Sequence, residues 1–270
     1  MTDFIMFAGP NGSGKSTVRD AVTNPAEVVI DPDRIARELN PSDPKSVEGQ
    51  AGREAIRRFE AALEGGRSLS METTLTGHTA VQRLRRAKDA GYDVSLIFVA
   101  LDNQELNVGR VAERVRSGGH HIPPELTRKR VAISIGNLPA ALAIADQAIV
   151  LDNSGKSHRP VMEIMDQRVT FLADKLPTWL EASMPDILAK LRPADLQVTK
   201  PQRAMTNIFS ALRKPVATTD APWATPAVSM IDRLATYQKR GAEAATTRLN
   251  DPDLDPKPDI APRPSTGPKL

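Results

Sequence analysis

The sequence contains no cysteine, which excludes disulfides, cysteine-ligated zinc and iron–sulfur clusters. Aromatic residues make up only 4% of the 270 residues, so a core must be built mainly from Leu, Ile, Val and Ala. Charge of one sign is also scarce, because 36 Lys and Arg stand against 33 Asp and Glu. The chain has no long basic run, so we expect no nucleic-acid partner.

Long apolar runs are missing as well. No stretch reaches the length of a transmembrane helix, so we expect no contact with a membrane. Residues 1–8 lack the basic start and the small-residue cleavage site of a signal peptide. These features together predict a cytoplasmic protein.

Short apolar runs alternate with amphipathic segments through the first part of the chain. Strands are expected in residues 3–10, 26–34, 68–75, 93–101 and 147–155. Helices are expected between them, in residues 15–22, 46–66, 80–92 and 105–119. This alternation predicts an α/β fold, with a parallel sheet flanked by helices on both faces.

The composition changes after this alternating region. We expect a first domain over residues 1–175 and a helical extension over residues 176–250. The last segment, residues 251–270, is rich in proline and has little to bury, so we expect it to be disordered.

The segment "GPNGSGKS" fits the phosphate-loop pattern G-x-x-x-x-G-K-S, between an expected strand and an expected helix. Its glycines let backbone N–H groups turn toward phosphate oxygens, and the helix adds its positive end. Lys15 is expected to reach the β- and γ-phosphates of ATP, and Ser16 to bind Mg²⁺. The predicted ATP-binding residues are Gly9, Pro10, Asn11, Gly12, Ser13, Gly14, Lys15, Ser16 and Thr17.

Sequence outside the loop distinguishes the classes of P-loop protein. A switch GTPase would need N-K-x-D, and a transporter ATPase would need L-S-G-G-Q; neither is present. Motor ATPases often end a strand with Asp-Glu, whereas "FVALDN" and "AIVLDN" both end in Asp-Asn. The missing water-activating Glu favours a kinase.

Polar residues follow two of the expected strands. Asp31 and Asp33 end the second strand, where a carboxylate can accept the proton of an attacking hydroxyl. The alternative is a capping turn, in which Asp33 begins the next helix. Glu72, Thr73 and Thr74 end the third strand and suit hydrogen bonding to a sugar, although they too could form a capping turn.

An arginine-rich stretch with a Gly-Gly and Pro-Pro interruption has the form of a lid over transferring phosphate. It carries Arg110, Arg114, Arg116, Arg128 and Arg130, of which Arg114 and Arg128 are the preferred catalytic candidates. The alternative is that they are solvated charges on a helix surface. His120 in the interruption is a candidate substrate contact.

Taken together, these segments resemble the zeta toxin family of UDP-N-acetylglucosamine kinases, and more narrowly its short branch, often labelled predicted ABC-type ATPases. The matching pieces lie in order over roughly residues 4–155: "FAGPNGSGKST", "DPDRIA", "METTLTG", "GYDVSLIFVALDN", "RVAERVRSGGHHIP" and "LDNSG". The resemblance implies an adenylate-kinase-like fold, transfer of the ATP γ-phosphate to the sugar 3′-hydroxyl, and toxicity held in check by an antitoxin.

The resemblance also implies roles for individual residues. Asp33 matches the general base and Arg114 a transition-state arginine, with Arg128 or Arg130 in the place of the second. Glu72 and Thr74 match residues that hold the amino sugar, and Glu54 matches a further substrate-side acid. Asn153 lies where the family approaches adenine. The family's long toxins carry an Arg after their acid, and "ETTLTG" has none.

Three hypotheses follow. The first is a kinase for a UDP-amino sugar, and the second is a P-loop kinase for another small molecule, such as a nucleotide, an antibiotic or a different sugar. The third is a nucleotide-dependent binding module whose helical extension engages a partner.

Overall fold

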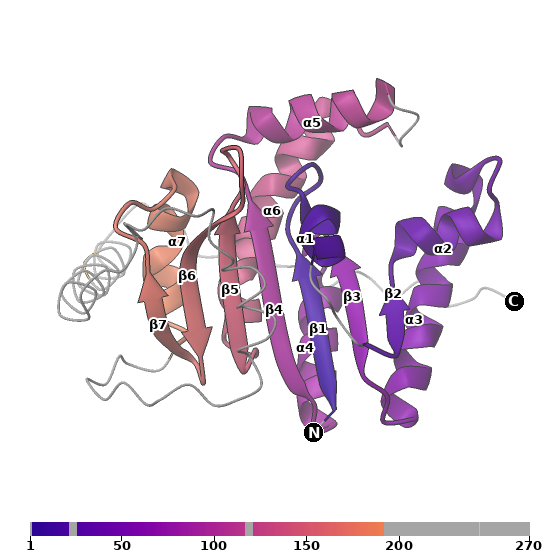
Figure 1. The fold of residues 1–270 in the computed structure, drawn as a ribbon, viewed down its shortest axis with the longest axis horizontal. Helices are drawn as coiled ribbons and strands as arrows, with labels where there is room; N and C mark the ends of the chain where they lie inside the picture. The colour runs from indigo at the N-terminus through magenta and orange to yellow at the C-terminus, as the bar shows by residue number, and fades with distance from the viewer. Residues whose placement is uncertain (1, 22–25, 117–120, 192–242, 244–270) are drawn as a thin grey trace, which may run out of the picture.

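The computed structural model describes residues 2–21, 26–116, 121–191 and 243. Its centre is a seven-stranded sheet in the order β2-β3-β1-β4-β5-β6-β7 (Figure 1). The strands are β1 Asp3–Ala8, β2 Val28–Ile30, β3 Leu69–Thr73, β4 Asp93–Ala100, β5 Gln147–Asp152, β6 Arg159–Met165 and β7 Arg168–Leu172. The first five run parallel and are the five strands that the apolar runs predict.

Helices surround the sheet and its upper edge. They are α1 Lys15–Ala21, α2 Pro32–Leu39, η1 Pro44–Val47, α3 Glu48–Glu64, α4 His78–Asp89, α5 Gln104–Arg116, α6 Pro124–Leu142 and α7 Thr178–Leu188. α1 lies in front of the sheet in Figure 1, whereas α3, α4, α6 and α7 lie behind it. No helix in the described ranges is long and apolar enough to cross a membrane.

The larger core lies between the sheet and the helices behind it. Alternate side chains of β1 divide between the two faces: Phe4 and Met6 join the larger core, and Ile5 and Phe7 join a smaller one with Val18 of α1. Strands buried on both faces account for the nearly continuous apolar runs. In α3, Ala55, Phe59 and Ala62 are buried, whereas the neighbouring Ile56 is 44% exposed.

Two elements differ from expectation. β6 and β7 form an antiparallel hairpin that extends the sheet beyond β5. α7 packs Trp179, Leu180 and Met184 into the larger core, which continues to Leu191. The expected domain boundary between residues 175 and 176 therefore lies within one continuous core. Apart from Glu243, the rest of the expected extension and the proline-rich tail lie outside the described residues.

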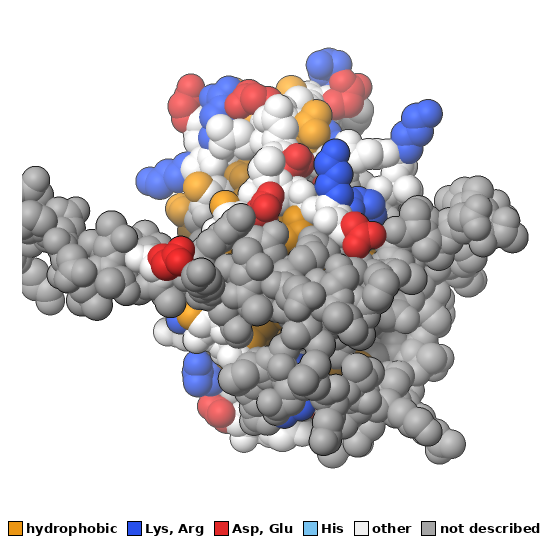
Figure 2. Space-filling view, turned by 90° about the vertical axis from the view of Figure 1, so that its left-hand side faces the viewer, with side chains coloured by type: hydrophobic (Ala, Val, Ile, Leu, Met, Phe, Trp, Pro, Cys, Tyr) orange, Lys and Arg blue, Asp and Glu red, His pale blue; other side chains and the backbone are white. Residues whose placement is uncertain are grey.

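The described surface mixes charges of both signs. On the face shown in Figure 2, blue and red side chains lie side by side and do not gather into a patch of one sign.

Candidate functional site

The phosphate loop joins β1 to α1 at the carboxyl end of the parallel strands, as its sequence predicts. Gly9, Gly12 and Gly14 have φ angles of 139°, 76° and 95°, which side chains rarely adopt. A Cβ at Gly9 would also lie 2.0 Å from the carbonyl oxygen of Val99 on β4. Glycine is therefore required here both by backbone conformation and by close packing.

Lys15 is buried at the start of α1, and its Nζ donates to the carbonyl oxygen of Pro10 at 3.0 Å. Burial lowers the pKa of Lys15, while the carboxylates of Glu72 and Asp33 oppose the shift and the guanidinium of Arg114 adds to it. The charges of three predicted site residues, Glu72, Asp33 and Arg114, thus all influence a fourth, Lys15. Thr17, two positions further along α1, is exposed.

Amide side chains hold the loop on its β4–β5 side. Asn107 of α5 is fully buried and donates from Nδ2 to the carbonyl oxygen of Asn11 at 2.7 Å. Asn153, after β5, donates from Nδ2 to the carbonyl oxygen of Ser13 at 2.8 Å. The structure therefore places Asn153 against the loop backbone. Arg110 in turn donates to the carbonyl oxygen of Asn153 at 2.8 Å.

Two polar atoms near the loop are buried without a hydrogen-bond partner among the described residues: Ser13 Oγ and Asn107 Oδ1. A Cβ at Gly14 would lie 3.4 Å from His158 Nε2, so this ring adjoins the loop. Burial lowers the pKa of His158, with Arg110 adding to the effect, so its neutral form is favoured.

Charged side chains hold the loop on its β2–β3 side. The hydroxyl of Ser16 donates to Glu72, with 3.1 Å to Oε1 and 3.2 Å to Oε2. One nitrogen of Arg19, Nη1, donates to Asp31 at 2.6 Å and to Glu72 at 2.8 Å. Burial raises the pKa of Glu72, and the charges of Lys15 and Arg19 oppose that rise.

The two aspartates after β2 have different environments. Asp31 is the N-cap of α2, because its Oδ1 accepts from the backbone N–H groups of Asp33 and Arg34 at 3.0 and 3.3 Å. Asp33 lies exposed in the first turn of α2. In the described part of the chain, no side-chain hydrogen bond or ion pair is formed by the Asp33 carboxylate. The capping role that the sequence left open for Asp33 thus belongs to Asp31.

The residues after β3 form a tight turn. Thr73 Oγ1 accepts from the backbone N–H of Leu75, whose φ is 56°, and the hydroxyls of Thr74 and Thr76 lie 2.8 Å apart. These contacts agree with the turn interpretation of Thr73 and Thr74, and the substrate role of the two residues stays a prediction.

The lid arginines separate into two groups. Arg114 is exposed on α5, and its charge acts on Lys15. Arg130 of α6 donates from Nη1 to Asn11 Oδ1 at 3.2 Å, so it reaches the loop. Arg128 instead makes a two-pronged ion pair with Glu105 at 2.7 and 2.9 Å. Of Arg128 and Arg130, only Arg130 contacts the loop among the described residues, so we carry Arg130 forward as the second arginine, and His120 lies outside the described residues.

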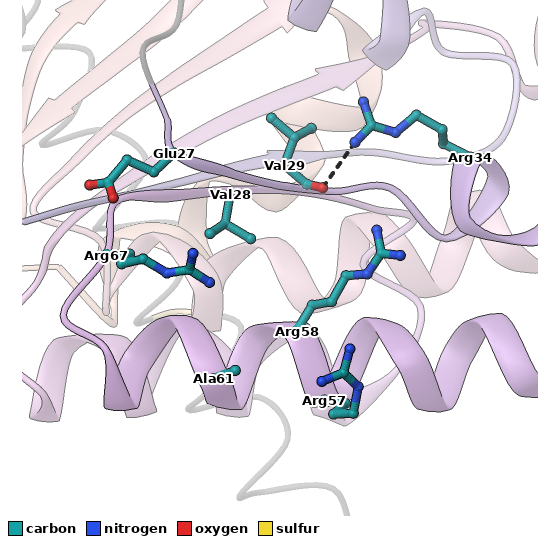
Figure 3. Close-up of a pocket in the computed structure, with 8 residues that line it drawn as sticks. All are labelled: Glu27, Val28, Val29, Arg34, Arg57, Arg58, Ala61 and Arg67. Atoms are coloured by element: carbon teal, nitrogen blue, oxygen red, sulfur yellow. Dashed lines mark hydrogen bonds between the residues drawn. The ribbon is translucent and has the colours of Figure 1, made fainter. Parts of the chain in front are cut away.

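Glu54 also departs from expectation, because its contacts do not reach the loop. Its carboxylate accepts from Arg57 and Arg58 on its own helix, and these hydrogen bonds lower its pKa to about 2. Arg58 continues to Glu38 of α2. These arginines line a pocket of about 320 Å³ beside the edge strand β2, with Arg34 and Arg67 (Figure 3). The structure thus assigns Glu54 to a surface ion-pair network.

The donors next to Lys15 fit Mg²⁺ that arrives with nucleotide. Mg²⁺ takes oxygen ligands and is commonly held by one or two protein groups together with phosphates. Ser16 offers such an oxygen, and Glu72 accepts its proton. In the described part of the chain, no three or more His, Asp or Glu side chains form a metal cluster, so an all-protein cage is not offered here.

Comparison with known proteins agrees with this geometry. Residues 4–132 match the family model described as AAA domain. An uncharacterized protein of Haemophilus influenzae is 39% identical over 126 residues, which are 47% of this chain and 90% of that protein. The chain belongs to the same family as this relative. The match to the family model covers the loop and the lid arginines and ends before β5.

Among solved structures, a chain of the AvrRxo1-ORF1:-ORF2 complex with ATP aligns with a TM-score of 0.52 and 11% identity, over 92% of this chain and 81% of that one. The PezAT toxin-antitoxin system of Streptococcus pneumoniae aligns with a TM-score of 0.43 and 15% identity, over 60% and 70%. At these identities, the first likeness shows the fold alone. That fold is a P-loop NTPase-like domain, with a mostly parallel sheet flanked by helices.

Proposed function

We propose that the protein is an ATP-dependent small-molecule kinase, with UDP-N-acetylglucosamine as its phosphate acceptor. The observation that carries this proposal is that Asp31 caps a helix whereas the neighbouring Asp33 carboxylate is exposed. Asp31 caps α2, which leaves the Asp33 carboxylate open to solvent while its charge acts on Lys15. A carboxylate so placed beside a phosphate loop suits a general base for an attacking hydroxyl.

The proposed reaction assigns each group a place. The acceptor hydroxyl loses its proton to Asp33 as its oxygen bonds to the γ-phosphorus, and the bond between that phosphorus and the β–γ bridging oxygen breaks to release ADP. Lys15 binds the β- and γ-phosphates, and Arg114 and Arg130 stabilise the charge that develops on them. Ser16 would hold Mg²⁺, whose contribution when bound is to neutralise charge on the phosphate oxygens.

The choice of acceptor rests on the resemblance of "METTLTG" and "DPDRIA" to the zeta toxin pattern. Thr73 and Thr74 supply hydroxyls at the end of β3, next to Glu72, which suit a sugar. Toxicity and an antitoxin partner belong to the same proposal. The AvrRxo1 structure is a complex of ORF1 with ORF2, and PezAT is a toxin-antitoxin system.

The test is mass spectrometry of UDP-N-acetylglucosamine after incubation with the protein, ATP and Mg²⁺. We expect a mass gain of one phosphate with the wild type and none with Asp33→Asn, which keeps the shape of the base. Glu54→Gln is the matched control, because Glu54 is bound in the α3 ion-pair network, and it should retain transfer. Equal turnover by Asp33→Asn would refute the base assignment.

A second candidate is a P-loop kinase for a different hydroxyl compound. The observation that favours it is the reduced sugar-binding set, because Glu54 pairs with arginines and Glu72 contacts Ser16 and Arg19. Absence of transfer to UDP-N-acetylglucosamine, with transfer to a component of a metabolite extract, would select this candidate. Nucleotide binding with transfer to no acceptor would instead favour a binding module.

A further inference from the structure

Arg19 lies on α1, one turn after Ser16, and joins three elements around the loop. Its side chain is only 21% exposed. It contacts Asp31 at the end of β2 and Glu72 near the end of β3 through the same Nη1, and its Nε contacts Asp20. Three carboxylates, those of Asp20, Asp31 and Glu72, therefore contact one partly buried guanidinium group.

The contacts of Arg19 offset the repulsion between two neighbouring carboxylates, those of Asp31 and Glu72. Asp31 and Glu72 are like charges in a partly buried place, and the charge of Asp31 disfavours the ionised form of Glu72. Arg19 contacts both and opposes this repulsion, together with Lys15 on the same helix. The charged groups that face Glu72 are therefore Lys15 and Arg19 from α1 and Asp31 from the end of β2.

The position of the Glu72 carboxylate in turn determines how the Ser16 hydroxyl is oriented. A hydroxyl that binds a cation through an oxygen lone pair keeps its proton and needs an acceptor for it. Glu72 already accepts that proton, with both carboxylate oxygens within 3.2 Å of Ser16 Oγ. Groups that orient a metal ligand in this way commonly change metal affinity by about 10–100-fold when they are removed.

We propose that Arg19 is a positioning residue that holds the Glu72 side chain directed at Ser16, so that the Ser16 oxygen is presented to the Mg²⁺ of a bound Mg-nucleotide. The proposal rests on the nucleotide-binding part of the proposed function but not on the acceptor. It also gives Glu72 a place at the phosphate end of the site in addition to any sugar contact. Asp31 links the same arginine to α2, which carries Asp33.

The experiment compares the dissociation constant of ATP with Mg²⁺ and with EDTA, measured by calorimetry on the full chain. In the wild type, Mg²⁺ should strengthen ATP binding. In Arg19→Met we expect this gain to fall by about tenfold or more, and Arg19→Lys should recover part of it. Arg85→Met removes an exposed arginine of α4 and should keep the full gain.

A further variant separates positioning from general damage. Should Arg19→Met fail to fold, Glu72→Gln tests the same contact, since it keeps the shape and removes the charge. A full Mg²⁺-dependent gain in either folded variant overturns the proposal.

The outcomes are distinct from those of the kinase test. A wild type that transfers no phosphate but shows an Arg19-dependent Mg²⁺ gain would refute the kinase and leave this inference standing. A wild type that transfers phosphate while Arg19→Met keeps its full gain would refute this inference alone. ATP binding by the wild type that ignores Mg²⁺ would overturn it as well.

Discussion

The two sides of the phosphate loop are held by different chemistry. On the β4–β5 side, neutral amides of Asn107 and Asn153 donate to loop carbonyl oxygens. On the β2–β3 side, Arg19, Asp31 and Glu72 form an ionic cluster that includes Ser16. Amide contacts to the backbone fix the loop's shape, whereas the ionic groups are those that can bind metal or move a proton. The β4–β5 side thus holds the loop backbone through neutral amides, whereas the β2–β3 side places charged groups next to Ser16.

The largest effect expected on ATP binding comes from a substitution at Gly14, on the amide side of the loop. A Cβ there would lie 2.4 Å from Asn153 Nδ2, and the φ of 95° strains any other residue by about 1–3 kcal/mol. Gly14→Ala should therefore weaken ATP binding by roughly 100-fold, measured by calorimetry. Gly109→Ala in α5 is the control, because its Cβ meets nothing within 4 Å, and it should stabilise the fold by about 0.5–1 kcal/mol. Equal ATP affinity in the two variants would contradict the packing argument.

The next effect tests which lid arginine serves the site. Arg130 reaches Asn11, whereas Arg128, two residues earlier on α6, pairs with Glu105. Arg130→Ala should lower the rate of phosphoryl transfer by about 10²–10³-fold, as loss of a transition-state donor does. Arg128→Ala should change it by less than about threefold, because an exposed ion pair contributes little. The reverse order in steady-state rates would restore Arg128 to the site.

A smaller effect is expected at Asn107. Its Nδ2 bonds to the loop, but its buried Oδ1 has no partner in the described part of the chain, which already costs free energy. Asn107→Ala should therefore lower the free energy of unfolding by only about 1 kcal/mol. Denaturant unfolding measures this loss, and a value several times larger would mean that Oδ1 is bonded after all.

The smallest effect is a pH dependence. Burial lowers the pKa of Lys15, and phosphate binding favours its charged form. As pH rises through the lowered pKa, the ammonium loses its proton and ATP binding should weaken, by at most about tenfold per pH unit for one proton. Calorimetry across this range should show the decline in the wild type and a flat profile in Lys15→Met. A flat wild-type profile would mean that Lys15 stays charged throughout.

The sequence allowed the parallel part of the sheet and the loop to be predicted, because both are local patterns. The β6–β7 hairpin was missed because its turn uses Asp166 and Gln167 at positive φ, with no glycine to mark it. The core role of α7 depends on contacts with distant elements, which periodicity does not contain.

Only the site residues that directly follow a strand could be predicted from the sequence. Asp33 and Glu72 follow apolar runs, so their approach to the loop could be expected. Whether Asp31 or Asp33 caps α2, and whether Arg128 or Arg130 reaches the loop, depends on side-chain directions that spacing leaves open. Arg19 was visible one turn after Ser16, but only the structure identifies its partners.

The most direct test of the two-sided loop measures ATP affinity and phosphoryl transfer in the same preparations of Asp33→Asn and Asn153→Ala. Asp33→Asn should bind ATP with nearly wild-type affinity and transfer no phosphate. Asn153→Ala should lose affinity while its transfer at saturating ATP stays close to that of the wild type. Loss of transfer without loss of affinity in Asn153→Ala would contradict its role in holding the loop, and loss of affinity in Asp33→Asn would contradict a role for Asp33 in proton transfer alone.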